Sequence, residues 1–507
     1  QSNIMASRSG IKVVPLKTKN PEKPEFAGDY ILKNVILSNH VGFKVDVLNI
    51  MTELNIYESI YKSAVTGTIV LADATNQIAR MSVQGLERIS FHLKTPGVTR
   101  GKEDVVDASE ETGEPFHVYK ITDRKQVTPG MITYTLHFAS REFMRNTRTK
   151  VSQAYDGKYD QAVRDIMSDK EYLDSRKKLY YESTGNQNKI VIPNLSPFEA
   201  IDYIAKRSIP EKSRGVGYYF YETTSGYYFR SWESMITESG TFARPQRQDF
   251  YYQPQKLQGD SNSTDQSSIE KDFESVEEYQ FTNNFHDVAA NTILGTYAHR
   301  VISHNLFDKS YHVNDYNFHR QYRKTPHTDT VEPNTGNMFP IMDTPVDYDN
   351  SDNLSDYKES RVSLQSTSPF LHDKDVGMYG LDVLQDGAST GQSVSQYNQV
   401  INGTELKLTI KGQSQLQAGD LIRFHLKDVN ADRVRDGNPV DPRFSGNYII
   451  TKVRHIVVHD DYKMILQCVK DSVATSYGDI APNPHLNVHE TSKSSTQFEE
   501  IDGDIGY

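Results

Sequence analysis

The chain has 507 residues, of which 36% are hydrophobic, and 56 Lys and Arg stand against 67 Asp and Glu for a formal net charge of −11. At this length one hydrophobic core does not suffice, so about three or four domains are expected. The acidic balance excludes a protein that grips nucleic acid through its phosphates, because that mode needs a basic face. No stretch approaches the ~20 apolar residues of a transmembrane helix. The single cysteine, Cys468, excludes an intrachain disulfide framework and fits synthesis in the cytoplasm.

The first part of the chain divides into a non-periodic arm and a β-rich segment. Residues 1–28 comprise four residues that resemble a tag remnant, followed by an extended arm with basic and proline residues. Over 29–145 the pattern predicts a first β-barrel domain, with strand candidates at 41–50 and 64–71. Gly67 lies inside the second candidate and predicts a bulge or a close approach to the backbone.

The hydrophobic period changes over 146–238, where we predict an α+β domain. One helix is expected over 159–170. A second begins at Pro197, because Ser196 is a favourable N-cap and Glu199 completes a capping box. The domain closes with a tyrosine-rich β-hairpin, 218–221 against 227–230.

Polar segments separate this domain from a second β-rich region. Residues 239–275 are predicted to be a linker, and 276–324 a connecting domain with a helix over 288–294. An irregular insertion is expected over 325–395, which is rich in Asp, Ser, Thr, Asn and Pro. The remaining segments are a second β-barrel domain over 396–472 and an acidic flexible tail over 473–507.

A short phrase recurs in the two β-rich regions. Ile89-Ser90-Phe91-His92-Leu93-Lys94 matches Ile422-Arg423-Phe424-His425-Leu426-Lys427, and in each copy apolar and polar residues alternate as in a strand with one buried face. Two further strands follow each copy at similar spacing. Amphipathic strands use few residue types, so a short match of residues can arise by chance. The common order of the strands is therefore the stronger sign of an internal duplication. The predicted fold is mainly β with an α+β insert: two related small, tube-like β-barrel domains, a middle α+β domain and extended linkers.

Motifs that would carry chemistry are weak. Gly387-Ala388-Ser389-Thr390-Gly391 has the letters of a hydrolase nucleophile elbow, but it lacks the flanking strand and helix that the elbow needs. The histidines between residues 286 and 327 do not have metal-ligand spacing. A pair of carboxylates for glycoside hydrolysis stays open, because such acids need only be close in space. We therefore expect no catalytic residues, no cofactor and no metal.

The second β-rich region resembles a known family. Its pattern Gly412-x-x-x-Leu416-x-x-Gly419-Asp420-x-Ile422, followed by Ser445-Gly446-x-Tyr448-x-Ile450 and Tyr462, is similar to the second barrel of baseplate hub proteins of contractile-tailed bacteriophages. The N-terminal part of VgrG spike proteins of type VI secretion systems is related to these hubs. Asn194–Ile201 with the tyrosine hairpin resembles the middle domain of a hub, and Asn291–Tyr297 the segment after it.

The resemblance implies a structural protein of the virion tail baseplate, assembled in the host cytoplasm, and not an enzyme. Three subunits with two barrels each would form a pseudo-sixfold ring. That ring would join the hexameric tail tube to a trimeric central spike protein, with or without lysozyme activity, next to other baseplate proteins. DNA would pass through the lumen without specific binding, and this chain would not insert into a membrane.

The polar positions of the repeated phrase are candidates for the contact with the ring or the tube. They are Ser90, His92, Lys94, Arg423, His425 and Lys427. Two alternatives stay open at this stage. One is a tail-associated cell-wall hydrolase or carbohydrate-binding component, and the other is a VgrG-like secretion spike base, although the repetitive β-helix of such spikes is not present in this sequence.

Overall fold

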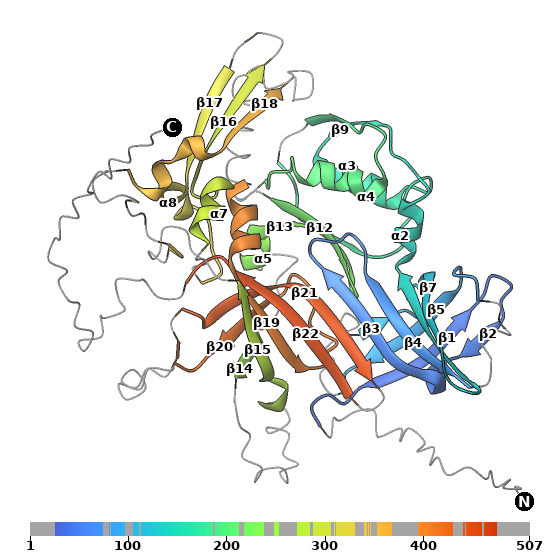
Figure 1. Cartoon of the computed structure of the whole chain (residues 1–507). Helices are drawn as coiled ribbons and strands as arrows, with labels where there is room; N and C mark the ends of the chain where they lie inside the picture. The colour runs from blue at the N-terminus through green and yellow to red at the C-terminus, as the bar shows by residue number, and fades with distance from the viewer. Residues whose placement is uncertain are drawn as a thin grey trace, which may run out of the picture.

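The fold is built around one large β-sheet that forms two barrel-like units (Figure 1). In the computed structural model the described residues are 26–74, 81, 83–96, 105–110, 113–185, 188–211, 217–237, 248–252, 271–283, 287–305, 309, 311–329, 339–341, 343, 345, 352–367, 394–428, 440–441, 443–458 and 461–473. The large sheet contains 14 strands, and three small sheets complete the β structure of these residues. The protein is thus mainly β, as predicted.

The first unit is an antiparallel sheet in the order β2-β1-β5-β7-β8-β4-β3, with β6 paired to β5. Its inward residues alternate along each strand and include Phe91, Leu136 and Phe138, which are fully buried. Its strands are β1 (Ile31–Ser38), β2 (Lys44–Asp46), β3 (Met51–Ser59), β4 (Thr66–Asp73), β5 (Arg88–Lys94), β6 (Val105–Asp107), β7 (Phe116–Thr128) and β8 (Met131–Ala139), with the short helix η1 (Leu48–Ile50).

The second unit is a closed barrel. Its strands pair in the ring β21-β20-β14-β15-β19-β22, and β22 pairs back to β21. Closure leaves apolar side chains such as Leu408, Phe424 and Leu466 without solvent exposure. The strands are β14 (Gln248–Tyr252), β15 (Ser275–Asn283), β19 (Thr404–Lys411), β20 (Leu421–His425), β21 (Gly446–Val458) and β22 (Asp461–Lys470).

The two units share one topology. Taken in chain order, β1, β3, β4, β5, β7 and β8 correspond to β14, β15, β19, β20, β21 and β22, and the neighbour relations agree except that no β1–β3 pairing occurs in the described residues. The first strand is antiparallel to β5 in one unit and parallel to β20 in the other. The copies of the repeated phrase lie in β5 and β20, which occupy equivalent places.

Irregularities in the strands repeat at equivalent positions as well. The β7–β8 pairing shifts between Val118 and Lys120, and the β21–β22 pairing shifts between Ile450 and Lys452. The β3–β4 pairing shifts between Met51 and Glu53, as the β15–β19 pairing does between Val276 and Glu278. Bulges are structural features that persist within families, so their agreement supports a duplication more strongly than the shared letters do.

A compact α+β unit sits on the first barrel (Figure 1). Ser196 donates from its hydroxyl to Glu199 at 2.7 Å and from its backbone N–H at 2.9 Å, which fixes the start of α4 at Pro197 as predicted. The aromatic hairpin β12–β13 packs its Phe220 and Phe229 into the same core as α3 and α4. The elements are α2 (Arg141–Asn146), β9 (Ala154–Gly157), α3 (Tyr159–Ser168), β10 (Leu179–Tyr181), β11 (Asn188–Val191), α4 (Pro197–Ala205), β12 (Tyr218–Thr223), β13 (Gly226–Ser231) and α5 (Trp232–Thr237).

A third core lies in the region predicted as a connecting domain and an insertion. Strands β16 and β17 form a hairpin, and β18 joins β16 in parallel although it lies inside the segment 325–395 that we expected to be irregular. Tyr297, Phe318 and Phe339 pack together in this core. The elements are α7 (Val288–Ile293), β16 (Ala298–Asn305), β17 (Tyr311–Asn317), α8 (Phe318–Tyr322), η4 (Leu354–Asp356), η5 (Lys358–Ser360) and β18 (Val362–Thr367).

The second barrel differs from the prediction in where it begins. Strand β14 lies within the expected linker 239–275, and β15 was assigned to the connecting domain. β14 has only five residues, and β15 has register shifts at both ends that interrupt its alternation of buried and exposed residues. A sequence pattern of strict period two therefore does not detect either strand.

Gly67 marks a close approach in the core of the first unit, as expected. A Cβ built at this position would lie 2.2 Å from Cζ of Phe138 and 2.5 Å from the backbone oxygen of Asn55. We predict that Gly67→Ala lowers the free energy of unfolding by about 2 kcal/mol, because the ring and the strand must shift to admit a methyl group.

Chemical denaturation followed by tryptophan fluorescence measures this loss. Gly185→Ala is the matched control, since its nearest heavy atom would lie at 3.5 Å. An equal response of the two variants would contradict the packing argument.

Candidate functional site

The two barrel units are joined edge to edge by one pair of strands. The second half of β21 adds antiparallel to β3, from Lys452 opposite Ser59 to Val458 opposite Glu53. Across this junction Arg454 donates to Oδ1 of Asn55 at 3.0 Å and forms an ion pair with Glu53 at 3.5 Å. The first half of β21 pairs with β20 along the same edge, so a single strand belongs to both units.

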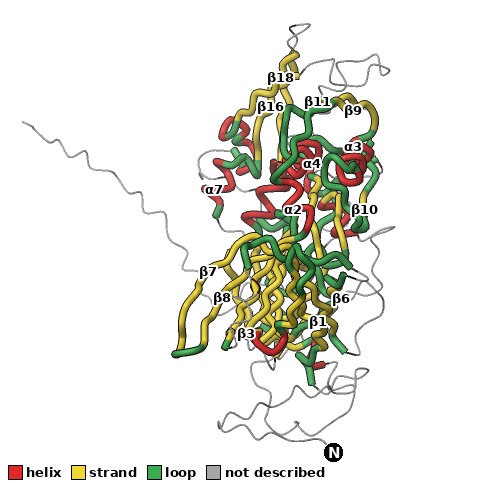
Figure 2. The backbone as a smooth tube through the Cα atoms, turned by 90° about the vertical axis from the view of Figure 1, so that its right-hand side faces the viewer, coloured by secondary structure: helices red, strands yellow, loops and turns green. Residues whose placement is uncertain are grey.

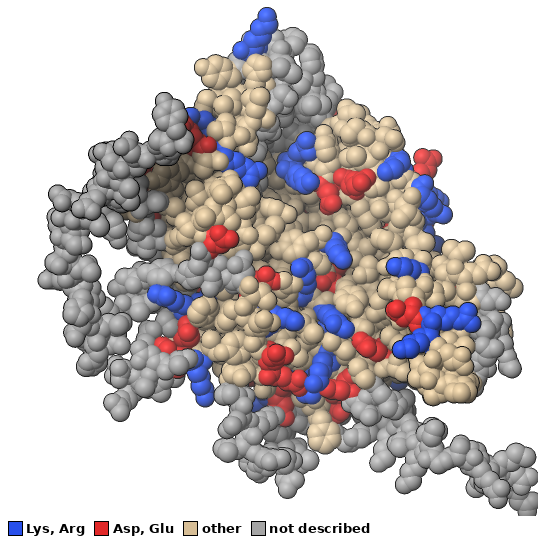
Figure 3. Space-filling view, in the orientation of Figure 1, with Lys and Arg blue, Asp and Glu red and all other residues tan. Residues whose placement is uncertain are grey.

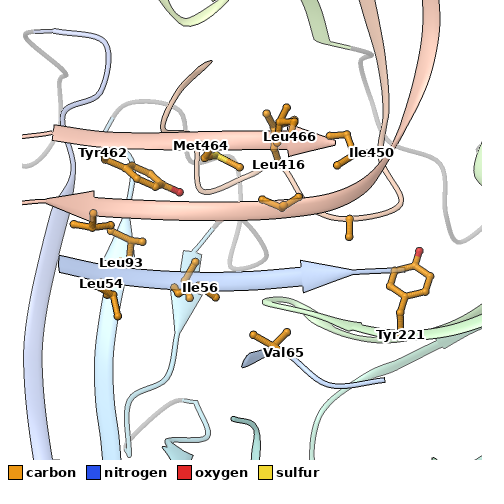
Figure 4. Close-up of a cluster of buried hydrophobic side chains, with 14 of the residues drawn as sticks. Leu54, Ile56, Val65, Leu93, Tyr221, Leu416, Ile450, Tyr462, Met464 and Leu466 are labelled. Atoms are coloured by element: carbon orange, nitrogen blue, oxygen red, sulfur yellow. The ribbon is translucent and has the colours of Figure 1, made fainter. Parts of the chain in front are cut away.

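The interior of the junction is continuous. Figure 4 shows Leu54 and Ile56 of β3 beside Ile450, Tyr462 and Leu466 of the second barrel, with Tyr221 of β12 next to them. These side chains belong to one cluster that extends through both units. The barrels therefore share a core and cannot separate without exposing it to water.

Glu58 connects three parts of the chain at this junction. It is 2% exposed, and its carboxylate accepts the backbone N–H of Thr224 at 2.8 Å and that of Ala418 at 3.0 Å. Thr224 lies in the turn of the α+β hairpin and Ala418 before strand β20, so Glu58 on β3 ties both to the first barrel. The buried ring of His455 lies 3.9 Å from the same carboxylate.

A second buried group of charges fixes the α+β unit. Lys177 forms ion pairs with Glu142 and Glu222, and Glu222 also accepts the backbone N–H of Val65 at 2.8 Å. Burial lowers the pKa of Lys177, but the charges of Glu222 and Glu142 outweigh this and hold it above its usual value. The ammonium therefore stays charged and offsets part of the negative charge of the two acids.

His327 and Asp471 form a buried pair that resembles part of a catalytic triad, but both ring nitrogens are engaged. Nδ1 lies 2.8 Å from the carboxylate and Nε2 lies 2.7 Å from the backbone oxygen of Tyr322. The other carboxylate oxygen accepts from the backbone N–H of Thr328 at 2.9 Å. A histidine held in this way has no free nitrogen to act as a base. The role of the pair is therefore structural, and it holds the third core against the end of β22.

We predict that Asp471→Asn destabilises the protein by about 3 kcal/mol at pH 7, because it removes a buried carboxylate that contacts His327 and accepts from Thr328. Burial raises the pKa of Asp471, yet His327 and the Thr328 donors outweigh it and hold the pKa below the usual range. A depressed pKa contributes stability above the unfolded value near 4, and this is lost as the pH falls.

Thermal melting across pH 3–8 checks this expectation. The difference between wild type and Asp471→Asn should shrink toward pH 3, whereas the exposed control Asp165→Asn should show little difference throughout. A pH-independent difference would contradict the electrostatic account.

The six predicted interface residues occupy equivalent strands of the two units but are not equally accessible. Ser90 is buried at 4% exposure, whereas His92, Lys94 and His425 are half-buried. Nε2 of His425 donates to the carboxylate of Asp249 at 2.9 Å, and its ring stacks on Tyr251 of the neighbouring strand β14. Only Arg423 and Lys427 are exposed. The six residues therefore differ in exposure, and the buried Ser90 is not available to a partner.

Metal-ligating and nucleophilic groups do not gather in the described part of the chain. No cluster of three or more His, Cys, Asp or Glu suited to a metal occurs among these residues. Nδ1 of His299 donates to the backbone oxygen of Gly295, and Nε2 of His319 donates to that of Ile341, so these two histidines are held at separate positions. His286 and the Gly387–Gly391 motif lie outside the described residues.

In the described part of the chain, a free strand edge on the β7–β8 hairpin is a feature that sequence reasoning missed. Beyond Tyr119 the hairpin β7–β8 extends away from the body (Figure 2) and pairs only within itself. Its outer residues from Asp123 to Thr128 are exposed. The run Asp123-Arg124-Lys125 within a strand of otherwise alternating pattern was the available signal, because a strand polar on both faces has no core to cover.

The surface carries both signs of charge. Figure 3 shows Lys and Arg interspersed with Asp and Glu over the visible face of the described residues. No helix in the described part of the chain is long and apolar enough to cross a membrane.

Comparisons with known proteins find distant structural likenesses. No family model and no curated protein matches the chain. The 43 kDa tail protein of prophage MuSo2 from Shewanella oneidensis aligns at a TM-score of 0.44 and 9% identity, covering 88% of this chain and 100% of that one. A tail protein from Neisseria meningitidis MC58 aligns at 0.44 and 9%, covering 87% and 97%. The E. coli c3393 protein, a type VI secretion component described as similar to the T4 tail proteins gp27 and gp5, aligns at 0.40 and 8%, covering 84% and 75%. At these scores the likenesses do not assign the chain to a family.

Proposed function

We propose that this chain is a structural subunit of a bacteriophage baseplate hub, in which three copies form a pseudo-sixfold ring between the hexameric tail tube and the trimeric central spike. The spike protein, the tube protein and other baseplate proteins are its partners. The subunit belongs to the virion tail and acts without catalytic chemistry of its own.

The observation that carries this proposal is the edge-to-edge junction of two units with the same topology. Because β21 of one unit meets β3 of the other, the contact joins different surfaces, as in a head-to-tail ring. A chain with two such units is suited to connect a partner of sixfold symmetry with one of threefold symmetry. The motifs that resemble hub proteins lie in the same elements, β19 to β22 and α4.

The acidic balance of the chain supports the passage of DNA. With 67 acidic against 56 basic residues, the assembled ring carries a net negative charge. A negative wall would repel phosphates and let DNA slide without binding.

A hydrolase or carbohydrate-binding role has less support. The triad-like pair found in the described residues, His327 with Asp471, is fully used in structural hydrogen bonds. A VgrG-like spike base would form the same kind of ring but would continue into a needle in its own chain. The hub and the spike base therefore differ in whether the central spike is a separate protein.

Native mass spectrometry of the purified chain tests the proposal. We expect a species at three times 57.7 kDa, about 173 kDa, either from the chain alone or after addition of the spike protein of the same phage. A chain that stays monomeric under both conditions would contradict the ring.

The polar residues of the repeated phrase give a second prediction. Lys94→Glu with Lys427→Glu should weaken co-sedimentation with the tail tube protein at least about tenfold, because charge reversal at a polar rim replaces attraction with repulsion. The melting temperature should stay close to that of wild type. Lys206→Glu, on the exposed side of α4, is the matched control, and unchanged tube binding by the double variant would remove these faces from the interface.

A further inference from the structure

We infer that the free outer edge of the β7–β8 hairpin pairs antiparallel with the free edge of β15 in a second copy of this chain. This inference rests on the proposed ring and names its subunit interface. It follows from the way in which the two units already meet inside one chain.

The donor edge is the second half of β7. Strand β5 pairs with β7 only at Phe116 and His117, and from Lys120 onward the edge opposite β8 has no partner strand in the described residues. The equivalent half of β21 begins at Lys452, after the same bulge, and pairs with β3 along the corresponding edge. The two hairpins thus match in position and in this bulge, although β7 has two further register shifts that β21 lacks, and only the β21–β22 hairpin is paired with another strand here.

The acceptor edge is the second half of β15. Strand β14 pairs with β15 only at Ser275 and Val276, and beyond Val276 the edge opposite β19 is unpaired in the described part of the chain. Its counterpart β3 is covered by β21 from Glu53 to Ser59. Among the described residues, the chain therefore presents an unused hairpin at β7–β8 and an unused acceptor edge at β15. These are the two halves of the contact that it makes internally.

The register follows from the internal contact. Glu53 of β3 corresponds to Glu278 of β15, since each comes directly after the same register shift in its strand. Val458 lies opposite Glu53 and forms the last pair of its own hairpin with Asp461, and the last pair of the β7–β8 hairpin is Thr128 with Met131, so Thr128 is its counterpart. Thr128 of one chain is therefore placed opposite Glu278 of the next, and Arg124 lies four residues before Thr128 as Arg454 lies four before Val458.

Charge supports this pairing. Inside the chain Arg454 on the hairpin bonds to Glu53 on the acceptor strand. Between chains Arg124 and Lys125 on the exposed hairpin would meet Glu278, which is also exposed. The neighbouring Glu277 already pairs with Lys411 at 2.9 Å and Lys463 at 3.0 Å, so Glu278 is the acid available to the incoming strand.

Repetition of this contact gives a closed assembly. Each unit donates one hairpin and accepts one, so contacts within and between chains alternate around the ring. The unpaired edges of β7 and β15, which would otherwise invite aggregation, are then covered. The occupant is a second copy of this chain because its hairpin is the structural equivalent of the one already seated on β3.

Engineered cysteines test the register directly. The only native thiol, Cys468, is buried, and burial raises its pKa, so it does not interfere. Thr128→Cys with Glu278→Cys should give covalent dimers and trimers on mild oxidation, reversed by reductant, because opposed Cα atoms in antiparallel strands lie within disulfide reach. Gln126→Cys with Glu278→Cys covers the two-residue shift that the extra residues of β7 between Lys120 and Thr128 allow.

The control is the internal pair. Glu53→Cys with Val458→Cys occupies the equivalent positions on β3 and β21 and should form a bond within one chain, without a ladder of higher mass. Thr128→Cys alone should give neither product. A trimer that forms in native mass spectrometry but is not linked by either interchain pair would overturn this inference and leave the ring intact, whereas the absence of any trimer would overturn both.

Charge exchange gives an independent readout. Arg124→Glu should weaken trimer association about tenfold, since it sets like charges against each other across the strands. Adding Glu278→Arg should restore association, and Lys206→Glu should leave it unchanged. Failure of the second substitution to rescue the first would place the hairpin against a different surface.

Discussion

The architecture depends on one strand that takes part in two barrels. β21 pairs with β20 through its first residues and with β3 through its last, while β22 runs along its other edge. A bulge at Thr451 separates these two halves and lets the strand turn from one unit toward the other. Loss of this strand would open the second barrel and also uncover the edge of the first.

Buried polar contacts then fix the orientation of everything attached to this junction. Glu58 holds the α+β hairpin and the loop before β20, and Asp471 holds the third core to the end of β22. Such groups are costly to bury and strongly destabilising to break, so they favour one arrangement over other compact ones. A ring subunit needs this rigidity, because a small error at each contact would prevent closure.

The sequence predicted the parts of this structure whose signals are local. The capping box at Ser196, the close approach at Gly67 and the equivalence of β5 and β20 all follow from short patterns, and the structure confirms them. The strands β14 and β15 were missed because one is short and the other is bulged, and β18 was missed because its partner β16 lies far away in the chain. Long-range pairing of this kind is decided by the whole fold and leaves no periodic trace.

The candidate site was predicted only in part for the same reason. Alternation identified the outward positions of β5 and β20, but it did not reveal that Ser90 is covered or that His425 is held by Asp249. The free edges of β7 and β15 became visible only when each strand was compared with its occupied counterpart. A strand edge is unpaired when no other strand lies beside it. This depends on the whole fold and is not encoded in the residues of the strand itself.

Electron cryomicroscopy of the purified assembly, reconstructed without imposed symmetry, tests the central claim most directly. The account predicts a threefold particle in which six barrel densities surround an open channel, with the hairpin β7–β8 of each subunit continuing the sheet of its neighbour. Single particles with two barrels and an unpaired hairpin, or a twofold dimer joined through other surfaces, would contradict it.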